Sequence, residues 1–241
     1  MIALKFLDQG AIGRFSGFSW PQPSDDRPGD WVESTDEVKQ CFRGIHALRS
    51  ADLPDWLDDE LWEIELDGDI VDAGEMLVAR RGRLLRRVDA WDEPTASAFA
   101  ADCALRARLR ALAALRRVGL TEDAERLVQA AELEQIQSAA ATAHEATADP
   151  DAAELTGFVA DVVSLATGQR PDAWRHGAEP NTAVAQRPAA IAANVAFVVA
   201  HVAGREAAAA HPDDPGAYER AFATERASQL AWLVAARVIV T

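Results

Sequence analysis

The stretch CFRGIHALRSADLPDWLDDELWEIE, residues 41 to 65, decides how the first part of this chain folds. Residues 41 to 47 are largely apolar and predict a buried strand, which ends at the polar pair Arg49-Ser50. Ser50 can cap a short helix ending near residue 60, in which Pro54 is tolerated because it stands in the first turn. Residues 61 to 66 then alternate with the two-residue period of a half-buried strand. We therefore expect a strand, a short helix and a second strand in close succession.

The residues on either side extend this pattern into a module of five or six strands. Residues 2 to 7 have a short apolar strand pattern, and a loop rich in glycine and aromatic residues follows it up to Trp20. Asp67-Gly68 predicts a turn, and two further strands, 75 to 78 and 84 to 88, are separated by Arg80-Arg81-Gly82. Residues 1 to 92 are therefore expected to form a small, mixed, strand-rich α+β module.

The composition changes at Trp91, and from residue 93 to 241 the chain is rich in alanine and poor in strand formers. Helices are expected at residues 95–117, 121–146, 150–167, 188–210 and 215–238. Alanine at so many helix positions predicts closely packed helices, since small side chains let helix axes approach. The fold class expected for the whole chain is thus α+β, with a strand-rich N-terminal module followed by an all-α helical bundle. Self-association of these helices into a homo-oligomer is a further expectation.

Composition and charge exclude several classes of protein. The chain has 241 residues, of which 49% are hydrophobic and 26% charged, as in folded soluble proteins. We find no apolar run of about 18 residues and no signal-peptide pattern at the start, so we expect a cytoplasmic protein without membrane binding. A net charge of -15 would repel a polyanion, which argues against nucleic acid as a partner. Two cysteines, Cys41 and Cys103, and scattered histidines give no metal-binding pattern.

Arginine is concentrated in one segment despite the overall negative charge. Between Arg80 and Arg117 there are ten arginines against four acidic residues. Such a segment can receive a small anionic ligand or an acidic partner protein, and Arg80, Arg81 and Arg83 are the ligand-binding candidates there. The alternative is a solvated face whose arginines pair with the acidic remainder of the chain.

Within residues 41 to 65 the main candidate for a functional side chain is His46. It stands between Ile45 and Ala47, so it is either a satisfied core residue or a group that faces a ligand and titrates near neutral pH. Cys41 is five positions away and would project from the opposite strand face, which argues against a cysteine and histidine pair.

Two resemblances extend over this region. LKFLDQGAIGRFSGFSWP, CFRGIHALRSADLPDWLDDELWEIELDG and LVARRGRLLRRVDAWDE, within about residues 3 to 110, resemble an uncharacterised family of actinobacterial proteins and, more loosely, a phage domain of unknown function. The family carries no established activity. The helical part, through AADCALRAR and AANVAFVVAHVAG, is vaguely similar to alanine-rich bacterial immunity-type domains.

The order of GIHAL, a short helix and LWEIELDG also resembles the ADP-ribosyltransferase superfamily. This resemblance implies NAD as cofactor, with His46 in place of the aromatic residue on the nicotinamide ring and Glu75 as the catalytic acid. The first strand lacks the early histidine or arginine that holds NAD in that superfamily, leaving only Arg14 nearby, and Arg43 is a further anion-binding candidate.

Our leading hypothesis from the sequence is a non-catalytic bacterial binding protein without a cofactor, acting on a protein partner or a small anionic ligand. The alternative is an enzyme of the ADP-ribosyltransferase type, or a degenerate relative of one, that uses His46 and Glu75 around NAD.

Overall fold

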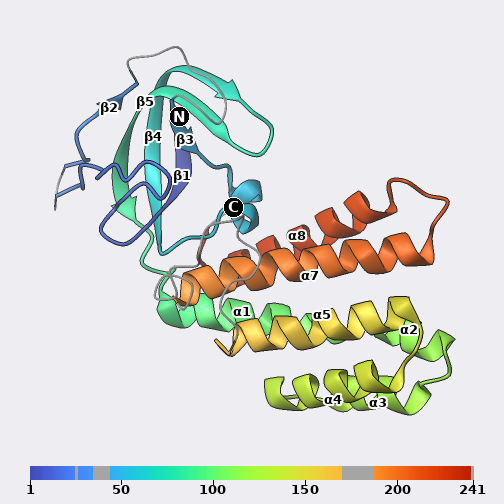
Figure 1. Cartoon of the computed structure of the whole chain (residues 1–241). Coiled ribbons are helices and arrows are strands. Elements are labelled where there is room, and N and C mark those ends of the chain that lie inside the picture. Colours follow the sequence, from blue (N-terminus) through green and yellow to red (C-terminus); the bar gives the residue numbers. More distant parts are fainter. Residues whose placement is uncertain (25–26, 35–43, 170–186, 240–241) are drawn as a thin grey trace. The chain divides into compact units, whose positions relative to one another are not determined.

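A computed structural model describes residues 1–24, 27–34, 44–169 and 187–239 of the chain. The chain divides into two compact units (Figure 1). The N-terminal unit comprises Met1–Thr95 and Leu230–Thr241, and the helical unit comprises Ala96–Gln229. An antiparallel sheet followed by a run of helices confirms the α+β fold class. The first unit extends three residues beyond the predicted boundary at residue 92, and it also includes the C-terminal segment, which the sequence pattern did not indicate.

Five antiparallel strands form the sheet of the N-terminal unit. They are β1 (Ile2–Leu7), β2 (Val32–Glu33), β3 (Ile45–Ala47), β4 (Glu60–Asp72) and β5 (Leu77–Arg87). Their order is β1-β4-β5-β2, and β3 pairs with β5 beyond the end of β2. The sheet curls on itself, because Leu4 of β1 and Leu48 after β3 exchange two backbone hydrogen bonds of 2.9 and 2.7 Å. The strand predicted at residues 2 to 7 is confirmed by β1.

One face of this curled sheet supplies the core. Ala3 and Leu7 alternate along β1 with outward residues, and their partners on β4 continue the same face. Gly82 lies inside β5, so the predicted break at residues 80 to 82 is wrong. A Cβ atom on Gly82 would lie 2.9 Å from Cγ2 of Ile45 and 3.1 Å from Cδ1 of Ile64. Glycine is used there for close packing and not to end the strand.

The turn predicted at Asp67-Gly68 is also wrong, because β4 continues through it to Asp72. The pairing of β4 with β5 shifts register between Asp67 and Ile70, and Gly68 has a φ of 79°. A bulge absorbs the one extra residue of β4 at this point, so the strand continues where a turn was predicted. The short helix after β3 is a 3-10 turn, Ser50–Asp55, and its N-cap is Arg49 and not the predicted Ser50.

Seven helices are described after the sheet. They are α1 (Glu93–Ala107), α2 (Leu112–Arg117), α3 (Thr121–Gln129), α4 (Leu133–Ala146), α5 (Pro150–Ala166), α7 (Pro188–Ala210) and α8 (Ala217–Ala235). The predictions for α5, α7 and α8 agree to within a few residues. The helices predicted at 95–117 and 121–146 are each broken in two. Glu132 is extended and caps α4, with the Gln135 side chain accepting from its backbone N–H, so a new helix begins there.

In the helical unit α4 packs on α5, and α5 packs on α7 (Figure 1). Gly204 of α7 is placed against the ring of Tyr218, where a Cβ atom would lie 2.5 Å from the nearest ring carbon. Among the described helices, α7 is long and apolar enough by composition to cross a membrane, and 67% of its apolar window is buried within the fold. That degree of burial is also typical of a core helix.

Candidate functional site

The loop Gly10–Trp20, here called the aromatic loop, follows β1 in the N-terminal unit. Its start is fixed by the buried carboxylate of Glu60, which accepts hydrogen bonds from the backbone N–H groups of Gly10 at 3.1 Å and Ala11 at 3.0 Å. The indole of Trp62 also donates to Glu60, at 3.1 Å. A buried carboxylate that satisfies several N–H groups holds a backbone rigidly. This anchor lets Ala11 keep a φ of 59°, which is costly for a residue with a Cβ atom.

The tip of the aromatic loop displays apolar side chains to solvent. Backbone hydrogen bonds from Gly13 to Phe18 at 2.8 Å and from Gly17 to Gly13 at 2.7 Å close the turn. Phe15 at its tip is 87% exposed, and Phe18 is 43% exposed while its ring meets Trp20 edge to face. A rigid loop with an exposed phenylalanine can insert that ring into an apolar pocket without ordering its backbone first. The sequence indicated an aromatic loop but could not show its exposure.

Three carboxylates lie at the base of the aromatic loop. Oxygens of Asp8, Asp58 and Asp59 lie within 4.8 Å of one another, so these residues are the described group that could hold a cation. The guanidinium of Arg14 lies 3.3 Å from Asp58 and competes for the same oxygens. Burial raises the pKa of Asp58 to about 6, although Arg14 acts in the opposite direction. The three carboxylates outnumber the guanidinium of Arg14 at the loop base.

Lys5 of β1 lies on the core face beside the backbone of His46. Its ammonium donates a 2.7 Å hydrogen bond to the carbonyl of His46 and lies 4.9 Å from the ring centre of Trp20. Burial lowers the pKa of Lys5 to about 8, and burial together with the Lys5 charge lowers the pKa of His46. In the described residues Nε2 of His46 is buried without a hydrogen-bond partner. His46 is therefore neutral at pH 7.

The two residues predicted as a catalytic pair are in different settings. His46 pairs with Val78 in the sheet, whereas Glu75 is exposed in the bend that joins β4 to β5. Among the described residues, the charged neighbour of His46 is Lys5 and not Glu75. Arg43 and Cys41 lie outside the described residues. The catalytic prediction and NAD binding remain predictions.

The predicted arginine candidates are engaged with carboxylates of neighbouring strands. Arg83 donates to Glu65 at 2.8 Å, Arg81 pairs with Asp67, and Arg80 lies 3.8 Å from Glu33. The guanidinium groups of Arg81 and Arg83 also lie 4.8 and 4.6 Å from the ring centre of Trp31. Cross-strand pairing of this kind fixes register and leaves little unpaired charge for a ligand. Their ligand-binding role remains a prediction.

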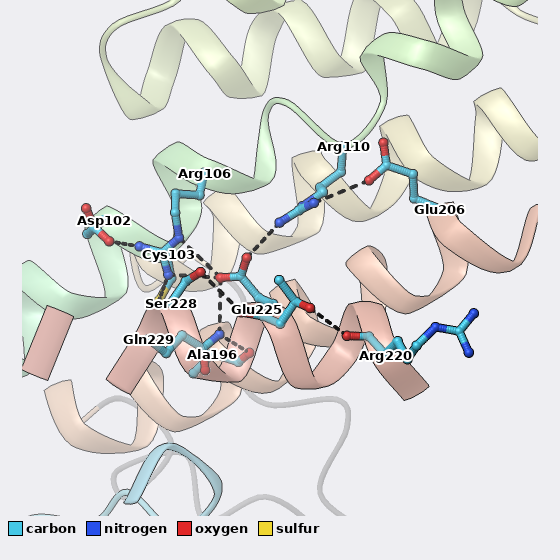
Figure 2. Close-up of polar contacts among 11 residues, drawn as sticks. Asp102, Cys103, Arg106, Arg110, Ala196, Glu206, Arg220, Glu225, Ser228 and Gln229 are labelled. Atoms are coloured by element: carbon cyan, nitrogen blue, oxygen red, sulfur yellow. Dashed lines mark hydrogen bonds and ion pairs between the residues drawn. The ribbon is translucent and has the colours of Figure 1, made fainter. Parts of the chain in front are cut away.

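The helical unit contains a buried polar network centred on Glu225 of α8 (Figure 2). Its carboxylate accepts from Arg106 at 2.9 Å and from Arg110 at 2.7 Å, both near the end of α1. Glu206 lies 3.5 Å from Arg110, and Cys103 accepts from Arg106 at 3.3 Å. Burial and the charge of Glu225 raise the pKa of the Cys103 thiol, so it is not a nucleophile at pH 7. The network joins α8 to the end of α1. The sequence placed Arg106 and Arg110 in the arginine-rich segment but did not indicate Glu225 as their partner.

A second polar cluster joins α7 to α8 and α5. His201 shares a 2.8 Å hydrogen bond with the hydroxyl of Tyr218, and its ring stacks on Phe197. Arg205 makes two 2.9 Å hydrogen bonds to Glu154. Burial and the charge of Arg205 lower the pKa of His201. These contacts satisfy the polar groups of an otherwise apolar helix.

Comparisons with known protein families, with curated proteins and with solved structures found no match for this chain.

Proposed function

We propose that this chain is a non-catalytic interaction protein that binds a protein partner through the aromatic loop. The observation that carries the proposal is the 87% exposure of Phe15 on a loop whose backbone is fixed by Glu60. Binding energy in protein interfaces is concentrated in a few aromatic anchors that fill pockets. A phenylalanine displayed on a rigid turn is such an anchor, and little entropy is lost when it inserts.

The charge around the aromatic loop defines the partner's chemistry. Asp8, Asp58 and Asp59 lie at the loop base, and the whole chain carries a net charge of -15. A partner with an apolar pocket rimmed by lysine or arginine would complement this surface and be steered toward it. Nucleic acid and anionic lipid would be repelled at long range. The proposed partner is therefore a protein with a basic surface around an apolar pocket.

Site-specific photocrosslinking tests the proposal in the native cell. Benzoylphenylalanine replaces Phe15 in one protein and Phe197 in the matched control, because Phe197 is also a half-exposed aromatic residue but belongs to the helical unit. We expect one discrete adduct from position 15 and none from position 197. Excess wild-type protein is expected to compete the adduct away, whereas the Phe15→Ala variant is not.

Adducts of equal yield from positions 15 and 197 would show that Phe15 is only a generally exposed ring. An adduct that the Phe15→Ala variant competes away as well as the wild type would place the binding surface elsewhere. Either result would overturn the proposal.

A further inference from the structure

A groove of about 640 Å³ opens in the N-terminal unit, between β1 and the C-terminal segment. Its floor is apolar and includes Ile2, Leu4 and Leu48, with Val238 and Ile239 from the C-terminal segment. Ile2 is 58% exposed, which is a large apolar area to leave in water. The volume lies within the range of about 300 to 1,000 Å³ found for small-molecule sites.

Arginines outnumber acids among the residues that line the groove. Arg49, Arg86, Arg87 and Arg237 line it, against the two acids Glu63 and Asp89. Three of these arginines are held by carboxylates of the unit: Arg49 by Asp52, Arg86 by Glu63 and Arg87 by Glu60. Within the described residues Arg237 has no carboxylate partner.

Arg237 also occupies an unfavourable backbone conformation. Its φ is 58°, and it ends α8 with backbone hydrogen bonds from Arg237 to Val234 and from Val238 to Leu233, both of 3.0 Å. This is the helix end at which glycine is the usual residue, because a Cβ atom in the left-handed region costs about 1 kcal/mol. An arginine at this position therefore lowers the stability of the fold, and its cationic side chain lies at the rim of the groove.

We propose that this groove binds a single-tailed amphiphile with an anionic head group. The apolar tail lies along Leu4, Leu48 and Ile239, and the head group pairs with Arg237. The apolar side chains would bind the tail of any such amphiphile, so the charge of the head group is selected by the guanidinium of Arg237, which has no carboxylate partner in the described part of the chain. This site is separate from the aromatic loop, and it does not depend on the protein partner proposed above.

Titration calorimetry of the full chain tests the proposal with decanoate, kept below the concentration at which it forms micelles. Decyltrimethylammonium has the same tail with a cationic head, and citrate is an anion without a tail. Arg237→Gly is the informative variant, because glycine relieves the backbone conformation and so cannot fail through misfolding. Arg237→Lys retains the charge, and Arg220→Gly removes an arginine of the helical unit that pairs with Asp214.

We expect saturable binding of one decanoate per chain and at least about tenfold weaker binding of the other two probes. Arg237→Gly should weaken decanoate binding by about tenfold or more, the loss of one charge-assisted hydrogen bond. Arg237→Lys should weaken it less, and Arg220→Gly should leave it unchanged. Equal binding of decanoate and decyltrimethylammonium, or unchanged binding by Arg237→Gly, would overturn the proposal. Binding to phosphatidylglycerol vesicles without binding of free decanoate would also overturn it, in favour of a membrane surface.

Discussion

Replacing Lys5 by methionine should alter how the stability of the N-terminal unit depends on pH. The ammonium of Lys5 is placed among core side chains, and burial lowers its pKa from 10.5 to about 8. At about 1.4 kcal/mol per pKa unit, this lowering corresponds to about 3 kcal/mol. Lys5 is only half-buried, so water screens part of the effect, and we expect about 2 kcal/mol.

The direction in which stability changes with pH follows from the number of protons that each state binds. Between pH 8 and 10.5 the unfolded chain holds a proton on Lys5 that the folded chain has lost, so stability rises with pH in this window. Below pH 8 the folded protein bears the full cost of a charged buried lysine. At pH 7 Lys5→Met removes that cost, but it also removes the hydrogen bond to the carbonyl of His46 and the contact with the Trp20 ring. These losses are worth about 2 kcal/mol together.

We therefore expect wild type and Lys5→Met to be equally stable at pH 7, within about 1 kcal/mol, and the wild type to gain about 2 kcal/mol over the variant by pH 10.5. Urea unfolding followed by tryptophan fluorescence measures this, since six of the seven tryptophans (20, 31, 56, 62, 91 and 232) lie in the N-terminal unit. Lys5→Arg is the control, because arginine stays charged throughout and should show no such gain. A constant stability difference between wild type and Lys5→Met over this pH range would refute the reasoning.

Three further predictions concern packing, titration and ligand specificity. Gly204→Ala should destabilise the helical unit by about 1 to 3 kcal/mol, because its Cβ atom would lie 2.5 Å from the Tyr218 ring. Gly157→Ala should stabilise the unit by about 0.5 to 1 kcal/mol, because the nearest atom to its Cβ would be 3.6 Å away. Thermal unfolding compares the two variants, and equal effects would contradict the close packing of Gly204 on Tyr218. The pKa of Asp58 is raised from 3.8 to about 6, so between these values the folded chain binds more protons at this residue than the unfolded chain does. The free energy of unfolding should therefore fall by about 2 kcal/mol as the pH rises from 4 to 6. Asp58→Asn should abolish this fall, as measured by urea unfolding. NAD should leave the melting temperature unchanged, and a shift that Glu75→Ala removes would instead favour the ADP-ribosyltransferase alternative.

The periodic parts of the fold could be predicted from the sequence, and the interruptions could not. β1, α5 and α7 follow from apolar spacing and from Pro150 and Pro188 at helix starts, which are local signals. The sequence pattern predicts a turn at Asp67-Gly68 and a break between two strands at Arg80-Arg81-Gly82. Tertiary packing decided otherwise, since Ile45 and Ile64 leave room for no side chain at position 82.

The candidate sites likewise have features that the local sequence predicts and features that depend on contacts between distant residues. The aromatic loop was visible as a pattern of glycines and phenylalanines, but Glu60, which fixes it from 49 residues away at Ala11, was not. Among the predicted site residues, Arg81 and Arg83 form ion pairs with carboxylates of the neighbouring strand. The backbone carbonyl of His46 accepts a hydrogen bond from Lys5, and Glu75 is not its charged neighbour. Sequence spacing predicts which residues share an element, but pairing between strands depends on register.

By itself, the sequence determined the α+β class, a strand-rich part followed by a helical part, and a strongly acidic chain with a local excess of arginine. These properties depend on composition and on periods of two or 3.6 residues, which are fixed by backbone geometry. Only the tertiary structure decided that Glu225 is buried between Arg106 and Arg110, and that the C-terminal segment lines a groove of the N-terminal unit. Contacts between residues more than a hundred positions apart arise from the closing of the fold, and no local pattern encodes them.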